Sequence, residues 1–315
     1  MIHVIAVCDH EEQYVTGLTD YLNMKEGFPY VVRAFTSPQA LYELHSVQKI
    51  EFILMEESLY DSLPALSDRE GIILLRESGM SRYPQIKSIY KYQSCERLIH
   101  ELYEIMSLQP ASERLLTRTR GLQLIGFYSP VKRCLQTTLA LTMGQLLGER
   151  KRVIYLNMET LSGLSYILGK DFSKDLSDLF YQIQEEKRDI ACLIESMTEQ
   201  INHLSVLPAM KFPTDLIQIS AKQWIQLFTA IEAGSEYEIL LIDLSDGVQG
   251  VFDILCQCDR IYTIRKDDRA AKEKEKQYRD LLQQSKYQSV REKSREIYLP
   301  DFIHLPRQAD RLLCK

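Results

Sequence analysis

Short apolar runs that alternate with helix-patterned segments are the feature that most restricts the fold of this 315-residue chain. Five runs precede residue 108: Ile2–Val7, Tyr30–Phe35, Glu51–Met55, Gly71–Leu75 and Ser88–Tyr90. Six follow: Gly121–Tyr128, Arg152–Leu156, Leu204–Leu207, Glu238–Ile242, Arg260–Ile264 and Glu296–Leu299. Strands that alternate with helices are typical of parallel, doubly wound sheets. We therefore predict an α/β fold with two doubly wound, mostly parallel sheets, and long helices at Leu176–Asn202, Ala221–Glu232 and Arg269–Ser285.

A polar stretch separates the two sets of apolar runs. Ser107 to Arg114 is polar with one proline, and the run from Arg114 to Arg120 carries three arginines. Such composition is typical of a connector between domains. We predict a first domain at 1–108, a linker at 109–120 and a second domain at 121–315.

Charge and hydropathy exclude several classes of protein. The formal net charge of −6 argues against a nucleic-acid binder, because affinity for polyanions comes from clustered Lys and Arg. No apolar run approaches the roughly 18 residues that span a bilayer, and the N-terminus has no basic segment of the signal-peptide kind. We expect a cytoplasmic protein that does not insert into a membrane, with recruitment to a membrane or cell pole left to a partner.

The cysteines do not indicate disulfides or a metal. Their number, seven, is odd, and they are scattered, which fits reduced thiols. Cys256 and Cys258 form the only close pair, and no second pair or histidine at ligand spacing lies nearby. We expect no metal site.

Polar residues follow the strands of the first half. A phosphoacceptor receiver domain needs acids after its first strand, an Asp after the third and a Lys after the fifth. Asp9 and Lys91 fit such a pocket, but Glu56 stands in place of the phosphoacceptor Asp. Because Glu is one methylene longer, it would crowd a magnesium pocket. We expect a receiver-shaped docking domain in which Glu56 and Lys91 form an ion pair instead.

The second half opens with a buried strand, a loop and a helix start, from Gly121 to Thr138. This is where a phosphate-binding loop belongs, and such a loop uses glycines, a Lys and a Ser or Thr. Here the loop between Pro130 and Thr137 has no glycine, and Gln136 precedes the two threonines. The arrangement of an NTPase is present without its phosphate-binding residues.

Several motifs extend this pattern along the chain: Phe127–Pro130, Tyr155–Glu159 with Ser162-Gly163, Asp243–Gly250 and, in the first half, Ile89–Gln93. In order and spacing they resemble the MinD/ParA group of P-loop ATPases. Within that group the chain is similar to TadZ/CpaE-type proteins of Flp (Tad) pilus assembly. Those proteins couple an atypical receiver domain to a MinD-like ATPase domain, and the resemblance covers nearly the whole chain.

The resemblance also shows where this chain departs from the family pattern K-G-G-x-G-K-T-[ST]. The family's signature Lys falls at Val131, its glycines at Lys132, Arg133 and Leu135, and its main Lys at Gln136. Thr137 retains the magnesium-binding hydroxyl, and Thr138 follows it. Each charge-assisted hydrogen bond that is lost costs roughly 1.5–3 kcal/mol. Lys132, Arg133 and the dipole of the following helix restore some attraction for an anion.

Three further positions complete the vestigial nucleotide site. Asn157 and Glu159 stand where the family has the two acids of its D-x-D motif, so Glu159 is the only acid left. Asp243 ends an apolar strand at the Walker-B place, where it would bind magnesium through water. Equally, Asp243 is placed to cap the turn from Leu244 to Gly247.

The resemblance implies a scaffold or localisation protein for a pilus or secretion machine, acting by protein–protein contacts and forming a homodimer without an ATP switch. It implies no catalytic residue and no required cofactor, with weak binding of ATP and magnesium as the alternative. Two other functions remain open: an active MinD/ParA-type ATPase that switches between monomer and dimer, and a signalling adaptor. Val131 and Gln136 stand where the family has its two lysines, so they favour the scaffold function over the ATPase.

Overall fold

The computed structural model describes residues 3–25, 28–62, 71–108, 121–183, 189–283 and 286–299. The chain divides into two compact units, Met1–Gln109 and Pro110–Lys315, and each is described by itself. The predicted linker at 109–120 lies outside the described residues.

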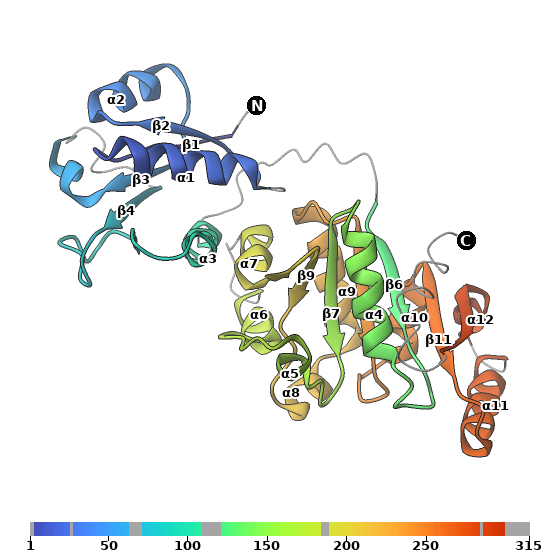
Figure 1. The fold of residues 1–315 in the computed structure, drawn as a ribbon. Coiled ribbons are helices and arrows are strands. Elements are labelled where there is room, and N and C mark those ends of the chain that lie inside the picture. Colours follow the sequence, from blue (N-terminus) through green and yellow to red (C-terminus); the bar gives the residue numbers. More distant parts are fainter. Residues whose placement is uncertain are drawn as a thin grey trace. The chain divides into compact units, whose positions relative to one another are not determined.

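The first unit is a parallel sheet with helices between its strands (Figure 1). Its elements are β1 (Val4–Cys8), α1 (Glu12–Met24), β2 (Val31–Phe35), α2 (Pro38–Val47), β3 (Phe52–Glu56), the 3₁₀ helix η1 (Glu57–Ser62), β4 (Ile72–Arg76), β5 (Ser88–Tyr90) and α3 (Cys95–Ser107). The strand order is β2-β1-β3-β4-β5, and every pair is parallel. The order reverses between β1 and β3, the point where open α/β sheets bind ligands at their carboxyl edge.

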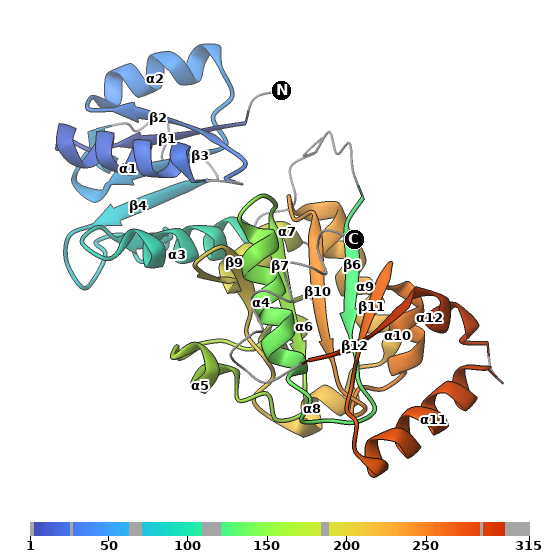
Figure 2. The ribbon, with the colours of Figure 1, turned by 45° about the vertical axis from the view of Figure 1, so that its right-hand side comes forward.

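The second unit is a larger sheet of the same class (Figures 1 and 2). Its elements are β6 (Gln123–Phe127), α4 (Gln136–Gly148), β7 (Val153–Met158), α5 (Leu164–Leu168), α6 (Leu176–Ile183), α7 (Ile190–Met197), β8 (Glu199–Ile201), β9 (Leu204–Leu207), α8 (Pro213–Gln218), α9 (Ala221–Gly234), β10 (Ile239–Leu244), α10 (Val251–Gln257), β11 (Arg260–Arg265), α11 (Arg269–Gln283), α12 (Gln288–Lys293) and β12 (Ser294–Tyr298). The strand order is β12-β11-β6-β10-β7-β9-β8, parallel except for the β8–β9 pair. The predicted α/β class with two mostly parallel sheets is confirmed.

The prediction of one helix over Leu176–Asn202 is wrong. Among the described residues of this range, 176–183 and 189–202, there are two helices, α6 and α7, and β8 then pairs with β9 as an antiparallel strand. Asn202 lies between β8 and β9 with a φ of 52°, so the chain reverses there through a left-handed residue. Tertiary pairing with β9 overrides the helical pattern of the preceding segment.

Both faces of the second sheet are covered by apolar packing. On one face, α4 packs on β6, β7, β9 and β10 around Phe127, Met143 and Tyr155. On the other, α9 and α10 cover a larger core that contains Trp224, the single tryptophan of the chain. Trp224 is fully buried and meets Phe180 edge to face, with ring centroids 4.8 Å apart. Burial on both faces explains why these strands are continuous apolar runs.

Among the described residues, no helix is long and apolar enough to cross a membrane.

The carboxyl end of α4 lies so close to the β8–β9 turn that Gly148 has no room for a side chain. A Cβ placed there would lie 1.9 Å from the backbone oxygen of His203. In α1, by contrast, a Cβ at Gly17 would meet nothing within 4 Å. Backbone atoms cannot rotate away as side-chain ends can, so the close approach at Gly148 restricts this position to glycine.

We expect Gly148→Ala to lower the free energy of unfolding by about 2 kcal/mol, because the added methyl forces the helix and the turn apart. The matched change Gly17→Ala should raise it by about 0.5–1 kcal/mol, since alanine favours a helix and meets no obstacle. Calorimetric unfolding of both variants and the parent chain measures the two effects. Equal effects of the two substitutions would contradict the close approach.

Candidate functional site

A cavity of about 270 Å³ lies at the start of α4, between the β6–α4 loop and the ends of β7 and β10. It is lined by Ser129, Lys132, Arg133, Cys134, Leu135, Gln136, Thr137, Thr138, Glu159, Leu244, Ser245 and Asp246. The predicted residues Lys132, Arg133, Gln136, Thr137, Thr138 and Glu159 are therefore all in its wall. Because the carboxyl ends of parallel strands meet at one edge, residues far apart in sequence come together here.

The β6–α4 loop has a backbone conformation that favours glycine. Lys132, Arg133 and Leu135 have φ values of 57°, 49° and 64°. These are the three positions at which the family resemblance places glycines. A left-handed residue other than glycine costs roughly 1–2 kcal/mol, so three of them in four residues are retained only where neighbouring contacts hold the loop. Ser129 supplies one such contact: its hydroxyl donates to the Ile264 carbonyl at 2.6 Å and accepts from the Val131 N–H at 3.2 Å.

Gln136, the first residue of α4, points inward rather than toward the cavity opening. Its amide nitrogen donates to Asp243 Oδ1 at 2.6 Å and to the Leu244 carbonyl at 2.9 Å. Gln136 is 8% exposed and Asp243 is fully buried. The position at which the family resemblance places the main Lys thus holds a neutral donor that is already bound to the buried carboxylate of Asp243.

The second oxygen of Asp243 is held from β7. Tyr155 donates its hydroxyl hydrogen to Asp243 Oδ2 at 2.8 Å, and Asn157 Nδ2 lies 2.8 Å from that hydroxyl and 3.3 Å from Oδ2. Burial raises the pKa of Asp243, although the hydrogen bonds from Gln136, Thr137 and Tyr155 lower it in part. Among the described residues, Asp243 accepts nothing from the N–H groups of the Leu244–Gly247 turn, so the capping alternative is not what the carboxylate does.

Charges of both signs line the cavity. Lys132 Nζ lies 2.6 Å from Asp246 Oδ1, and both side chains are more than half exposed, so this pair contributes little to stability. Burial, with the nearby Asp243, raises the pKa of Glu159 to about 7. The lining thus contains the cations Lys132 and Arg133 together with Asp246 and the partly ionised Glu159, and Asp243 lies behind them. These acids offset part of the positive charge that a ligand with several negative charges would need.

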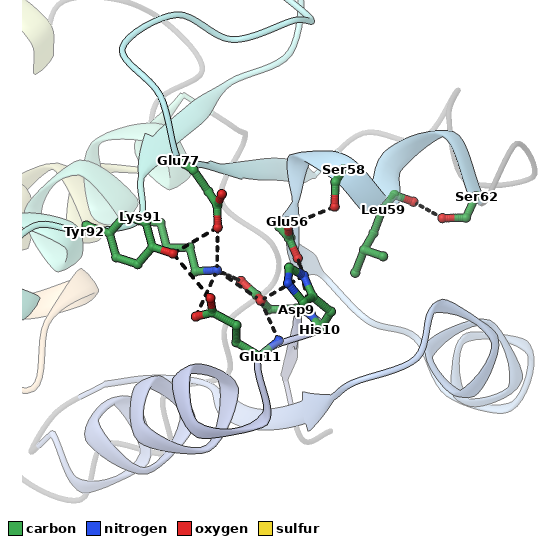
Figure 3. A network of polar contacts seen from close by, with 10 residues as sticks. All are labelled: Asp9, His10, Glu11, Glu56, Ser58, Leu59, Ser62, Glu77, Lys91 and Tyr92. Carbon is green, nitrogen blue, oxygen red and sulfur yellow. Dashed lines mark hydrogen bonds and ion pairs between the residues drawn. The ribbon is translucent and has the colours of Figure 1, made fainter.

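In the first unit, Lys91 is surrounded by acids (Figure 3). Its ammonium nitrogen lies 2.9 Å from Asp9 Oδ2, 3.1 Å from Glu77 Oε1 and 3.4 Å from Glu11 Oε2. Both Lys91 and Asp9 are buried. Burial alone would lower the pKa of Lys91, but Asp9 and Glu77 raise it well above its usual value. The ammonium group is therefore retained as a permanent charge.

Glu56 lies in the same pocket but binds a different partner. Its Oε2 contacts His10 Nδ1 and the His10 N–H, and its Oε1 accepts from Ser58 at 2.8 Å. The predicted ion pair between Glu56 and Lys91 is therefore wrong. The extra methylene of Glu turns its carboxylate toward His10, and the shorter Asp9 takes the lysine. Burial would raise the pKa of Glu56, but the bonds from His10 and Ser58 outweigh it and the pKa lies below its usual value.

Several residues that matter in the two sites were not singled out in the sequence. Tyr155 reads as a core aromatic in an apolar strand, and only its pairing beside Asp243 gives its hydroxyl a role. His10, Glu77 and Asp246 lie in loops, whose side chains no periodicity places. Of these residues, His10 is the one that the sequence could have indicated, because it lies in Cys8–Glu11, an acidic run that follows a buried strand.

No protein-family model and no curated protein matches the chain. Among solved structures, the chain is similar to a ParA family ATPase from Chlorobium tepidum TLS, with 14% identity and a TM-score of 0.46 over 62% of this chain and 81% of that one. It is similar to a plasmid partition protein from Borrelia burgdorferi (14% identity, TM-score 0.44, 62% and 86% of the two chains). It is also similar to MinD of Aquifex aeolicus in a MinC:MinD complex (16% identity, TM-score 0.44, 59% and 72%). Such neighbours say nothing of this chain's ligands.

The backbone of the β6–α4 loop yields the first prediction for this site. We expect Arg133→Gly to be more stable than Arg133→Ala by about 1 kcal/mol, because only glycine relieves the left-handed φ, and its greater freedom in the unfolded chain offsets part of the gain. Urea unfolding followed by Trp224 fluorescence measures the difference. The control position is Arg150, whose φ is not positive. There, Arg150→Ala should be at least as stable as Arg150→Gly, and a more stable glycine variant would contradict the explanation.

The second prediction concerns pH. Between about pH 4.5 and 7 the folded chain keeps a proton on Glu159 that the unfolded chain has released, so stability falls as pH rises through this window. Glu159→Gln stays neutral. We expect it to match the parent chain near pH 4.5 and to be more stable by about 2 kcal/mol at pH 8. Urea unfolding at both values tests this. A difference in stability between the two proteins that is the same at both pH values would contradict the raised pKa of Glu159.

Proposed function

We propose that this protein is a scaffold or localisation protein that acts through protein–protein contacts, of the TadZ/CpaE kind that the motifs resemble, and that its second unit does not turn over ATP. The hydrogen bond from Gln136 to Asp243 carries the proposal. Phosphoryl transfer depends on positioning and on neutralising charge. At this site the lysine is absent and the carboxylate that would hold magnesium is bound to protein side chains.

Exposed apolar side chains in the segment after β7 support a role in protein contacts. Leu161, Tyr166 and Ile167 follow β7 just after Glu159, and they are 82%, 96% and 55% exposed. Exposed apolar groups that gather in one segment are typical of interaction surfaces. We propose that this segment and the cavity face a second copy of the chain, or a component of a pilus or secretion machine, without a nucleotide between them.

An ATPase of the MinD/ParA type is the second candidate function. The three left-handed loop residues and the uncapped start of α4 favour it, because this backbone can present N–H groups to a phosphate. The charge of the cavity lining and the binding of Asp243 to Gln136 weigh against it. Weak binding of ATP without turnover lies between the two functions.

Titration of the full chain with labelled ATP and magnesium tests the proposal directly. We expect no saturable binding below about 1 mM, no phosphate release, and the same mass by light scattering with and without Mg-ATP. In Gln136→Lys, we expect affinity for ATP to rise about tenfold, since one charge-assisted bond of about 1.5 kcal/mol is restored.

A matched variant shows whether any gain belongs to the site. Gln257→Lys adds the same charge at the exposed end of α10, and its affinity for ATP should equal that of the parent chain. Phosphate release by the parent chain, together with an ATP-dependent shift from monomer to dimer, would establish the ATPase and end the proposal. An ATP-independent dimer with no release would support the scaffold.

A further inference from the structure

The two edge strands of the first sheet, β2 and β5, differ in their capacity to pair with another strand. β5 has three residues and β2 has five. An edge strand presents N–H and C=O groups to which a strand of another chain can bond, and very short edges limit such pairing. The segment Tyr30–Phe35, which contains β2, is rich in β-branched and aromatic residues and has no glycine or proline. β2 is therefore the edge at which pairing between chains needs to be controlled.

The hydrogen bonds to β1 show which backbone groups of β2 face outward. β1 and β2 are parallel, the Val31 N–H donates to the His3 carbonyl at 2.9 Å, and the Phe35 carbonyl accepts from the Asp9 N–H at 3.1 Å. Alternate residues of a strand bond the same neighbour. The backbone groups of Val31, Arg33 and Phe35 therefore face β1, and those of Val32 and Ala34 face away from it.

The side chain of Asn23 bonds both outward groups of Val32. Asn23 Nδ2 donates to the Val32 carbonyl at 3.0 Å, and the Val32 N–H donates to Asn23 Oδ1 at 2.9 Å. A neighbouring antiparallel strand bonds an edge residue in the same way, with one donated and one accepted hydrogen bond. The amide group of Asn23 thus occupies the place that a residue of a neighbouring strand would take.

The position of Asn23 in α1 supports this role. It is the residue before the last one of α1, which packs beside β2 (Figure 1). Asparagine is a weak helix former, so helix stability does not account for it there. Met24 and Val31, its neighbour and that of Val32 in the chain, are 83% and 46% exposed. Apolar surface that a second strand would cover is thus present beside the two bonds.

We propose that the outer edge of β2 is a pairing surface for a second copy of this chain, and that the amide of Asn23 holds it closed. Two copies related by a two-fold axis through Val32 would pair as antiparallel strands. Each Val32 would then exchange with its counterpart the two bonds that Asn23 makes here. Pairing therefore requires that Asn23 leave the edge. The inference concerns the first unit alone, so it goes beyond the proposed function and does not rest on it.

Light scattering of the full chain carrying Asn23→Ala, over a wide range of concentrations, tests the proposal. We expect the mass of the variant to rise with concentration toward twice that of the parent chain, because the outward groups of Val32 are released. Alanine favours a helix more than asparagine does, so α1 should form in the variant. Circular dichroism verifies that it is folded.

A second substitution shows whether the association passes through β2. Ala34→Pro removes an N–H that faces away from β1, so no bond between β1 and β2 is lost. Added to Asn23→Ala, it should restore the mass of the parent chain. Asp20→Ala, at an exposed position of the same helix, should leave the mass unchanged.

The proposal fails if Asn23→Ala has the mass of the parent chain at every concentration. It also fails if Ala34→Pro does not reverse the association, because the contact would then lie elsewhere, or if Asp20→Ala associates to the same extent. None of these outcomes changes the result of the ATP titration, so the scaffold proposal is tested separately.

Discussion

The hydrogen bond between Gln136 and Asp243 connects the parts of the second unit that a nucleotide would otherwise organise. Asp243 ends β10, Gln136 begins α4, and Tyr155 and Asn157 reach the same carboxylate from β7. A buried carboxylate without donors is costly, and here side chains of the protein supply the donors. The position of α4 relative to the sheet is therefore set by internal contacts. The scaffold proposal depends on this: a site that is already satisfied needs no ligand to reach its final shape.

The two units satisfy their buried acids in similar ways. In the first, Lys91 binds Asp9, and in the second, Gln136 binds Asp243. Each acid follows or ends a parallel strand, and side chains provide most of its partners. Asp9 Oδ1 also accepts a hydrogen bond from the Glu11 N–H at 2.9 Å. The first pocket differs because its second buried acid, Glu56, is bound by the half-exposed His10. In the second site the cation is replaced by the neutral amide of Gln136.

Much of the fold could be predicted from the sequence, because strands buried on both faces are continuous apolar runs and helices between them are amphipathic. The β8 strand could not be predicted: three residues, Glu199–Ile201, carry too little pattern, and their pairing with β9 decides their conformation. The residues around the cavity could be named because the order of motifs brings strand ends together. The direction of each side chain could not be predicted. Whether Glu56 contacts Lys91 or His10 depends on one methylene and on the loop after β1.

The buried position of Trp224 has a practical consequence. This ring absorbs and emits from the interior of the second unit, and the chain has no other indole. Its emission therefore reports the environment of that unit alone, while tyrosine and far-ultraviolet signals sum over both. Melting curves recorded by the two kinds of probe will coincide if the halves come apart in one transition and separate if each half melts at its own temperature.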